Sequence, residues 1–170
     1  MPTIGVALAI PEPWATELQD YRTSLGDATA TSIPTHITLV PPTEVDDAAL
    51  PLIEEHLVGV AAESPVFDVH LRGTGTFRPV SPVVFVTVAK GISQCEQLAF
   101  MARSGPLDVP VAFPYHPHVT IAHHLEDDVL DRAFEELADF ECSFVAQGFH
   151  LYGHDEQIGW QPTRAFPLGR

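Results

Sequence analysis

Two short segments with the same pattern constrain the fold of this chain more than any other feature. Each has a histidine, an apolar residue, a threonine and a second apolar residue: HITL begins at His36 and HVTI begins at His118. The alternation predicts a β-strand in which the histidine and the threonine project from one face, roughly 7 Å apart, while the apolar residues face the core. Because almost half the chain separates the two segments, the sequence predicts two strands of equivalent design.

The rest of the chain alternates between strand-like and helix-like segments. Apolar and β-branched runs predict strands at residues 3–10, 36–42, 66–71, 83–89, 118–124, 140–152 and 159–168. Apolar residues at helical spacing predict helices at residues 11–25, 46–62, 93–103 and 127–138. Asp46 is the expected N-cap of the second helix, and Ser93 with Glu96 forms a capping-box pattern at the start of the third.

Glycine and proline mark the connections between these elements. The segment RGTGTFRPVSP, residues 72–82, is expected to be an irregular connection, and GHDEQIG, residues 153–159, is the expected turn of a C-terminal hairpin. Each half of the chain then runs in the order motif strand, helix and two strands. We expect a single α+β domain over residues 1–170, built as a two-lobed pseudo-symmetric duplication. Antiparallel sheets would line a central cleft, with the helices outside.

Charge narrows the range of ligands. The chain has 8 basic and 23 acidic residues and a formal net charge of −15. Such a field repels nucleic acid at long range, so no long nucleic acid is expected as a partner, although local donors can still bind a small anion. The apolar N-terminal run lacks a positive leader and soon meets prolines, and no run approaches the roughly 18 apolar residues of a membrane helix. We therefore expect a monomer in the cytoplasm with no membrane partner.

The two motifs suit phosphodiester chemistry if the halves pack with an approximate two-fold relation. His36 with Thr38 and His118 with Thr120 would then face one cleft. Histidine titrates near neutral pH, so two of them can divide the roles of general base and general acid. The threonine hydroxyls can donate hydrogen bonds to non-bridging phosphate oxygens and stabilise the charge that develops there. Imidazolium and hydroxyl donors supply the electrostatics, so no metal and no cofactor is expected.

The segments HITL and PHVTIAH resemble the motifs of the 2H phosphoesterase superfamily, and within it the bacterial proteins called 2′-5′ RNA ligase or RNA 2′,3′-cyclic phosphodiesterase. The segments IGVALAI and GTGTFRPVSPVVFVTV share in the resemblance. It implies that His36 and His118 are the catalytic pair and that Thr38 and Thr120 bind the phosphate. One histidine would activate water or a hydroxyl, and the other would protonate the departing ribose oxygen of a 2′,3′-cyclic phosphate. The reverse reaction would form a 2′,5′ linkage, and the sequence leaves open which histidine is the base.

The chain departs from this resemblance at one place. Many RNA-acting members carry an arginine just after the second motif, where this chain has His123 and His124. This difference favours a small cyclic phosphate, a nucleotide or a short RNA end as the substrate, with the two histidines as candidate contacts. Arg78 could supply a cation instead. Phe77 and Tyr115 could stack on a base, which contributes about 1–3 kcal/mol per base, although ordinary packing is the alternative for each ring.

Two alternatives remain open from the sequence. In the first, His116, His118, His123 and His124 bind a metal ion such as zinc. On a regular strand, however, His118 and His124 share one face while His123 points the other way, so convergence would require a bulge. In the second, the protein is a non-catalytic module that keeps the cleft only to bind a nucleotide.

Overall fold

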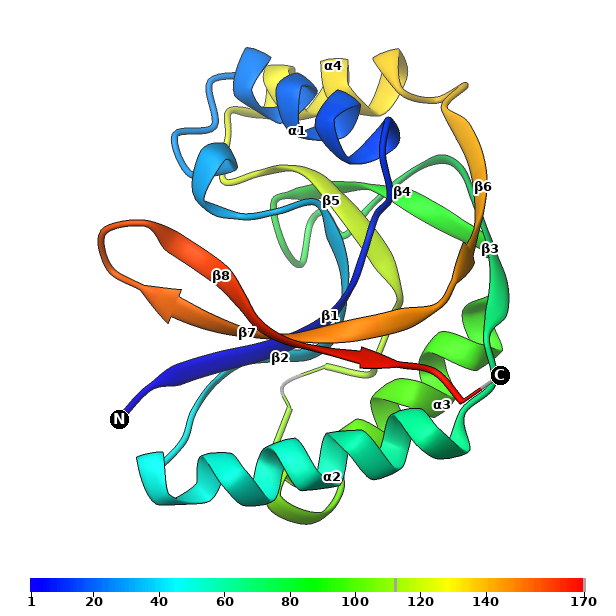
Figure 1. Cartoon of the computed structure of the whole chain (residues 1–170). Helices are drawn as coiled ribbons and strands as arrows, with labels where there is room; N and C mark the ends of the chain where they lie inside the picture. Colours follow the sequence, from blue (N-terminus) through cyan, green and yellow to red (C-terminus); the bar gives the residue numbers. More distant parts are fainter. Residues whose placement is uncertain (112, 170) are drawn as a thin grey trace.

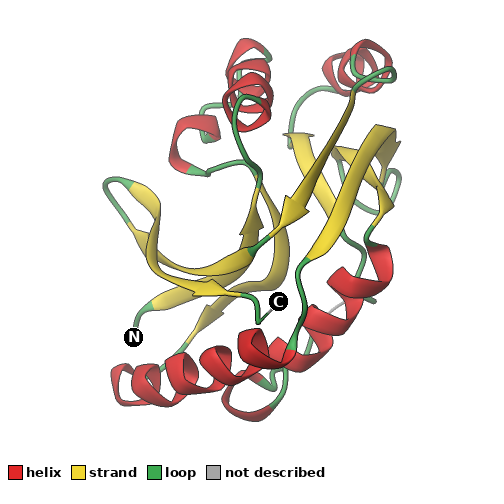
Figure 2. Ribbon diagram, turned by 45° about the vertical axis from the view of Figure 1, so that its right-hand side comes forward, coloured by secondary structure: helices red, strands yellow, loops and turns green. Residues whose placement is uncertain are grey.

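The computed structural model describes residues 1–111 and 113–169, and within them two four-stranded antiparallel sheets with four α-helices (Figures 1 and 2). The first sheet has the order β2-β1-β7-β8, and the second has the order β5-β4-β3-β6. The strands are β1 (Thr3–Ala9), β2 (His36–Glu44), β3 (Phe67–Thr76), β4 (Val83–Lys90), β5 (His118–His123), β6 (Glu141–Ala146), β7 (Gly148–Asp155) and β8 (Gly159–Pro167). The helices are α1 (Trp14–Ser24), α2 (Leu50–Glu63), α3 (Ile92–Ala102) and α4 (Asp127–Glu136).

The element order contains an internal duplication. The series β1-α1-β2-α2-β3 is followed by β4-α3-β5-α4-β6, and β7 and β8 close the chain. The two sheets are nevertheless not the two halves of the chain. Strand β3 pairs with β4 and β6, and β7 returns to pair with β1, so both ends of the chain build the first sheet and the middle builds the second. The predicted two-lobed α+β architecture is therefore confirmed, with an exchange of strands between the halves.

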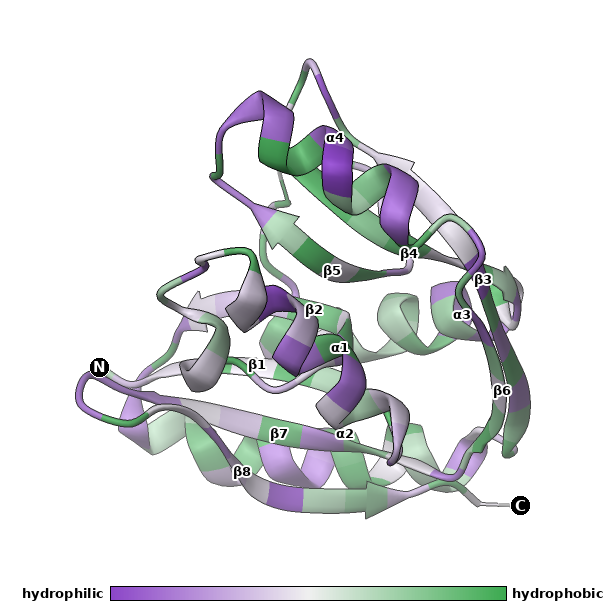
Figure 3. Cartoon of the chain, turned by 90° about the horizontal axis from the view of Figure 1, so that it is seen from above, coloured by the Kyte–Doolittle hydropathy of each residue, from purple (hydrophilic) through white to green (hydrophobic). Residues whose placement is uncertain are grey.

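The two motif strands are edge strands that lie next to each other. Helix α1, which connects β1 to β2, packs against β5, and helix α3, which connects β4 to β5, packs against β2. The apolar residues of both motifs are fully buried: Ile37, Leu39, Val119 and Ile121. Each motif strand is thus held from behind by the core and from the side by the other half's helix. Figure 3 shows mixed hydrophobic and hydrophilic colouring along α4, which buries Leu130 and Ala133.

The predicted N-caps of two helices were wrong. A short 3₁₀ turn, Asp47–Ala49, precedes α2, and Asp46 makes no side-chain capping hydrogen bond. Helix α3 begins at Ile92 after Gly91, whose φ of 101° is left-handed. A Cβ atom on that glycine would lie 2.9 Å from the carbonyl oxygen of Asp68. The tight turn from β4 into the helix therefore requires glycine at the cap, and Ser93 lies inside the helix.

Two predicted strand boundaries also changed. Strand β3 continues to Thr76, through part of the expected connection, because Gly73, with φ of 72°, sits in a register shift of the β3–β4 pair. The expected strand at 140–152 is two strands, since β6 pairs with β3 in the second sheet and β7 pairs with β1 in the first. The β7–β8 hairpin is confirmed. Of the described helices, none is both long and apolar enough to cross a membrane.

Candidate active site

The half-buried faces of β2 and β5 carry the four motif side chains. His36 and Thr38 project from β2, and His118 and Thr120 project from β5, each between fully buried neighbours. His36 and Thr38 line one pocket, and Thr38 and His118 line a second. Thr38 borders both pockets, and we call them the two arms of the cleft. Thr120 lies on the same face of β5 as His118 and is not among the residues that line either arm.

The same backbone contact orients both histidines. The Nδ1 atom of His36 lies 2.6 Å from the carbonyl oxygen of Pro34, and the Nδ1 atom of His118 lies 2.7 Å from the carbonyl oxygen of His116. A carbonyl oxygen only accepts hydrogen bonds, so Nδ1 carries the proton in each ring. In the neutral form each Nε2 therefore has a free lone pair, which is the atom that can take a proton from a substrate or a water.

The surroundings of both histidines favour the neutral form. Burial lowers the pKa of His36, and the charge of Arg22 lowers it further, while the carbonyl of Pro34 partly opposes both. Burial also lowers the pKa of His118, and positive charge on His116 and His36 adds to the effect. The two motif histidines are thus close enough to act on each other's charge. Protonation of one histidine therefore makes protonation of the other harder. This favours a state in which the pair holds a single proton.

Aromatic rings surround His118. The ring of Phe77 meets it edge-on, with 4.9 Å between centroids, and the ring of Phe85 lies 5.2 Å away. Phe77 and Phe85 also contact each other, with 4.5 Å between centroids. A Cβ atom on Gly75 would lie 2.7 Å from the ring of Phe85, so glycine is required there for this close approach. Phe77, a candidate for base stacking, also packs against the histidine itself.

The other candidate contacts from the sequence differ in their partners and in whether they line the cleft. Arg78 donates to Asp131 on α4 at 2.8 Å, so a carboxylate already pairs with its guanidinium. Tyr115 lines the cleft and donates its hydroxyl to the carbonyl oxygen of Thr38 at 2.7 Å. Arg103 lies over the Tyr115 ring, 5.1 Å from its centroid, and also lines the cleft. The sequence did not identify Arg103 as a cleft residue. Arg103 ends a predicted helix, and its position in that helix does not show that its side chain reaches the cleft.

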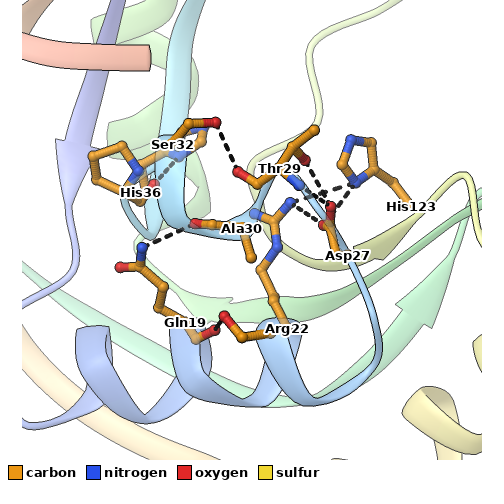
Figure 4. A network of polar contacts seen from close by, with 10 residues as sticks. Gln19, Arg22, Asp27, Thr29, Ala30, Ser32, His36 and His123 are labelled. Atoms are coloured by element: carbon orange, nitrogen blue, oxygen red, sulfur yellow. Dashed lines mark hydrogen bonds and ion pairs between the residues drawn. The ribbon is translucent and has the colours of Figure 1, made fainter. Parts of the chain in front are cut away.

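His123 belongs to a buried polar network (Figure 4). Its Nδ1 lies 3.4 Å from Nη2 of Arg22 and 3.4 Å from the carboxylate of Asp27. Arg22 is 2% exposed and pairs with Asp27 at 2.9 Å. Burial by itself raises the pKa of Asp27, but hydrogen bonds from Thr29 and Arg22 outweigh burial and lower it, so Asp27 is a carboxylate. His123 therefore joins the end of β5 to α1 and its following loop.

The histidines of the metal alternative separate into two pairs at opposite ends of β5. His116 and His118 lie at its start, with 6.0 Å between ring centroids, and His123 and His124 lie at its end, 4.9 Å apart. His124 is exposed and has a left-handed φ of 55°. Within residues 1–111 and 113–169, no three histidine, cysteine, aspartate or glutamate side chains form a group that could hold a metal ion.

The two arms of the cleft differ in size and lining. The narrow arm, of about 160 Å³, lies beside His36 against β1, β7 and β8, with Tyr152 and Trp160 in its wall. The wide arm, of about 690 Å³, lies beside His118, between the loop after β3 and the segment before β5. Its rim includes the exposed side chains of Val80 and Phe113. No sequence pattern identified Tyr152 or Trp160, because they come from the far end of the chain.

Known proteins match this chain over most of its length. The family model described as the 2′-5′ RNA ligase superfamily matches residues 10–157. A protein of Oceanobacillus iheyensis named "Putative phosphoesterase OB1230" is 30% identical over 142 residues, which are 81% of this chain and 82% of that protein.

Solved structures share the fold. The crystal structure of TT0787 of Thermus thermophilus superimposes with a TM-score of 0.74 at 22% identity, over 99% of this chain and 98% of that one. The crystal structure of Escherichia coli LigT complexed with 3′-AMP superimposes with a TM-score of 0.65 at 21% identity, over the full length of both chains.

Proposed function

The chain belongs to the 2′-5′ RNA ligase superfamily, and we propose that it is a phosphodiesterase that acts on 2′,3′-cyclic phosphates or 2′,5′-linked nucleotides by paired-histidine acid–base catalysis. One observation carries this proposal: His36 and His118 each donate Nδ1–H to a carbonyl oxygen, which leaves both Nε2 atoms free at one cleft. Neither role in the chemistry needs a metal ion, because a neutral imidazole is a base and an imidazolium is an acid at near-neutral pH.

In the proposed hydrolysis, the Nε2 atom of the neutral histidine accepts a proton from a water molecule while the oxygen of that water bonds to phosphorus. The bond from phosphorus to the ribose O3′ breaks, and the protonated histidine gives its proton to that oxygen. The product is a 2′-phosphate, and the pair ends with its protonation states exchanged. Thr38 and Thr120 donate hydrogen bonds to the non-bridging oxygens, where negative charge develops. The same steps with a 5′-hydroxyl in place of water form a 2′,5′ linkage, and their reverse cleaves that linkage to a 2′,3′-cyclic phosphate and a 5′-hydroxyl.

A small substrate fits the charge around the cleft. The whole chain has only 8 basic residues. Two of them near the site are already paired with carboxylates: Arg78 with Asp131, and Arg22 with Asp27. A protein that follows a nucleic acid backbone needs several phosphate contacts. The E. coli LigT crystal structures with 3′-AMP, NADP⁺ and ATP support small nucleotides as ligands of this fold. A short RNA end with a cyclic phosphate is compatible with the wide arm. A monomeric state and a cytoplasmic location remain predictions.

Single histidine substitutions test this proposal. With nucleoside 2′,3′-cyclic phosphates, His36→Ala and His118→Ala should each lower kcat by about 10²- to 10⁴-fold, in the presence of chelator as in its absence. His70→Ala is the matched control, because His70 is a partly exposed strand histidine that pairs with Glu141 on the second sheet. Activity of both cleft variants within threefold of wild type would refute the acid–base roles. Nucleotide binding without turnover in the wild type would favour a non-catalytic module.

A further inference from the structure

We propose that the narrow arm of the cleft is a nucleobase site, in which the base of the substrate stacks against Trp160 while its phosphate lies between the two His-Thr pairs. The inference rests on the proposed function and specifies how the substrate is oriented in the cleft. The nucleoside that carries the cyclic phosphate would lie on the first sheet, beside His36, and the wide arm beside His118 would admit water or a second nucleoside.

Small residues of β1 make room for the narrow arm. Ala7 stands opposite Thr38 in the β1–β2 ladder, and Gly5, Val6 and Ala7 line the arm. In the second sheet the corresponding neighbour of Thr120 is Phe85. Cross-strand neighbours share a face of the sheet, so Phe85 fills the space that Ala7 leaves open.

The duplication thus shows what fits beside a motif histidine. The protein's own rings, Phe77 and Phe85, pack against His118. Beside His36 the equivalent space is an open pocket of about 160 Å³. A cavity of roughly 150 Å³ holds one benzene molecule. The narrow arm therefore has the size for the ring of a nucleobase and is too small for a second nucleoside.

Trp160 provides a stacking surface at the wall of this arm. Its six-membered ring lies over Gly5, where an added Cβ atom would be 3.5 Å away, and its ring also lies beside that of His154, with 5.0 Å between centroids. Trp160 is only half-buried, although tryptophan is a large apolar side chain. Stacking of a base would cover more of it, and base–aromatic stacking tolerates every base because each has a π-face.

Tyr152 provides a polar group in the same wall. The residue is 7% exposed and lines the arm. Its hydroxyl has no hydrogen-bond partner within the described chain and is not a fully buried atom, so a ligand in the arm can reach it. A nucleobase edge offers both donors and acceptors, whereas an aliphatic group offers none. The pairing of a flat apolar wall with an unpaired hydroxyl therefore favours a base over a lipid chain.

Fluorescence can test base binding without turnover. The chain has two tryptophans, and Trp14, at the start of α1, packs against Phe144 outside the cleft. In the Trp14→Phe variant all tryptophan emission comes from Trp160. A 2′-nucleotide should quench this emission saturably, and inorganic phosphate at the same concentration should not. Absence of quenching by a nucleotide that inhibits turnover competitively would overturn the inference.

Kinetics separate this inference from the proposed function. Trp160→Ala should raise KM for a nucleoside 2′,3′-cyclic phosphate roughly 5- to 150-fold, with a smaller change in kcat, and Trp160→Phe should recover most of the loss. KM for the base-free methyl riboside 2,3-cyclic phosphate should not change. Equal effects on both substrates, or none, would refute the base site while His36→Ala and His118→Ala still report on the chemistry.

A second pair of variants tests the base site without replacing Trp160, in case the Trp160→Ala variant does not fold. Gly5→Ala adds one methyl group to the arm at ordinary contact distances from Trp160 and Val40. It should raise KM for the nucleotide and not for the base-free substrate. Gly59→Ala is the matched control, because an added Cβ atom on α2 would have no neighbour within 4 Å. A Gly5→Ala variant with the KM values of Gly59→Ala would count against the site.

Discussion

The Nδ1 nitrogen of His36 lies 2.6 Å from the carbonyl oxygen of Pro34, two residues earlier in the chain. His118 repeats this relationship with the carbonyl oxygen of His116. The contact sets the tautomer and the orientation of each ring through the backbone alone, so neither histidine needs a carboxylate behind it. It also gives a role to His116, to which sequence reasoning assigned none in catalysis.

Activity should peak on the acid side of neutrality. Burial lowers the pKa of both His36 and His118 below the ordinary value of about 6.5. In the proposed mechanism the active form has one ring protonated and one neutral, and this form is most abundant between the two pKa values. The plot of kcat/KM against pH should therefore have its maximum below pH 6.5 and fall as the acid loses its proton toward pH 7. A maximum at or above pH 7 in the free enzyme's profile would contradict this.

Loss of the Thr38 hydroxyl should slow turnover. If that hydroxyl stabilises charge on the phosphate, Thr38→Val should lower kcat/KM by about 10²- to 10³-fold, since removal of one such donor has an effect of this size. Valine keeps the shape of the side chain and the backbone carbonyl that Tyr115 contacts. Thr38→Ser retains a hydroxyl and should stay within about tenfold of wild type. Equal losses in both variants would indicate a packing role instead.

The buried pair of Arg22 and Asp27 should make a large contribution to stability. Asp27→Ala leaves the guanidinium of Arg22, which is 2% exposed, without its carboxylate. Breaking a buried pair in this way costs about 3–5 kcal/mol in the free energy of unfolding. The control is Glu54→Ala, which removes the partly exposed pair with Arg164 at 3.2 Å and should cost about 1 kcal/mol or less. Urea unfolding at pH 7 measures both, and similar losses would refute the distinction.

Replacing Gly59 should stabilise the protein. Gly59 lies on the exposed side of α2, with open space where a Cβ atom would be. Gly59→Ala should therefore raise the free energy of unfolding by about 0.5–1 kcal/mol, because alanine has less backbone freedom to lose in a helix. Gly91→Ala should do the opposite, since Gly91 has φ of 101° and a close backbone neighbour. Thermal unfolding of the two variants should move the midpoint in opposite directions.

The sequence predicted most elements because local pattern and tertiary environment agree in them. Ile37 and Leu39 alternate with His36 and Thr38, and the structure buries the first pair and leaves the second partly accessible. The errors fall where a distant contact overrides the local pattern. Gly91 begins α3 because the backbone at Asp68 leaves no room for a side chain, and no local pattern around Ser93 reports that contact.

The candidate site divides in the same way. Tyr152 and Trp160 line the arm beside His36 only because β7 returns to pair with β1 and β8 pairs with β7. Arg22 approaches His123 because α1 of the first half packs against β5 of the second. The spacing of residues in the sequence predicts neither contact, because most of the chain separates the partners.

From the sequence alone, the alternation in HITL and HVTI determined that each histidine shares a strand face with its threonine, because strand geometry has a period of two. The repeat of that pattern determined that two such faces exist. Only the tertiary structure decided which surroundings each face receives. Ala7 opposite Thr38 leaves a narrow open arm, whereas Phe85 opposite Thr120 fills the equivalent space. Strand pairing sets that choice, and pairing partners are fixed by the whole core.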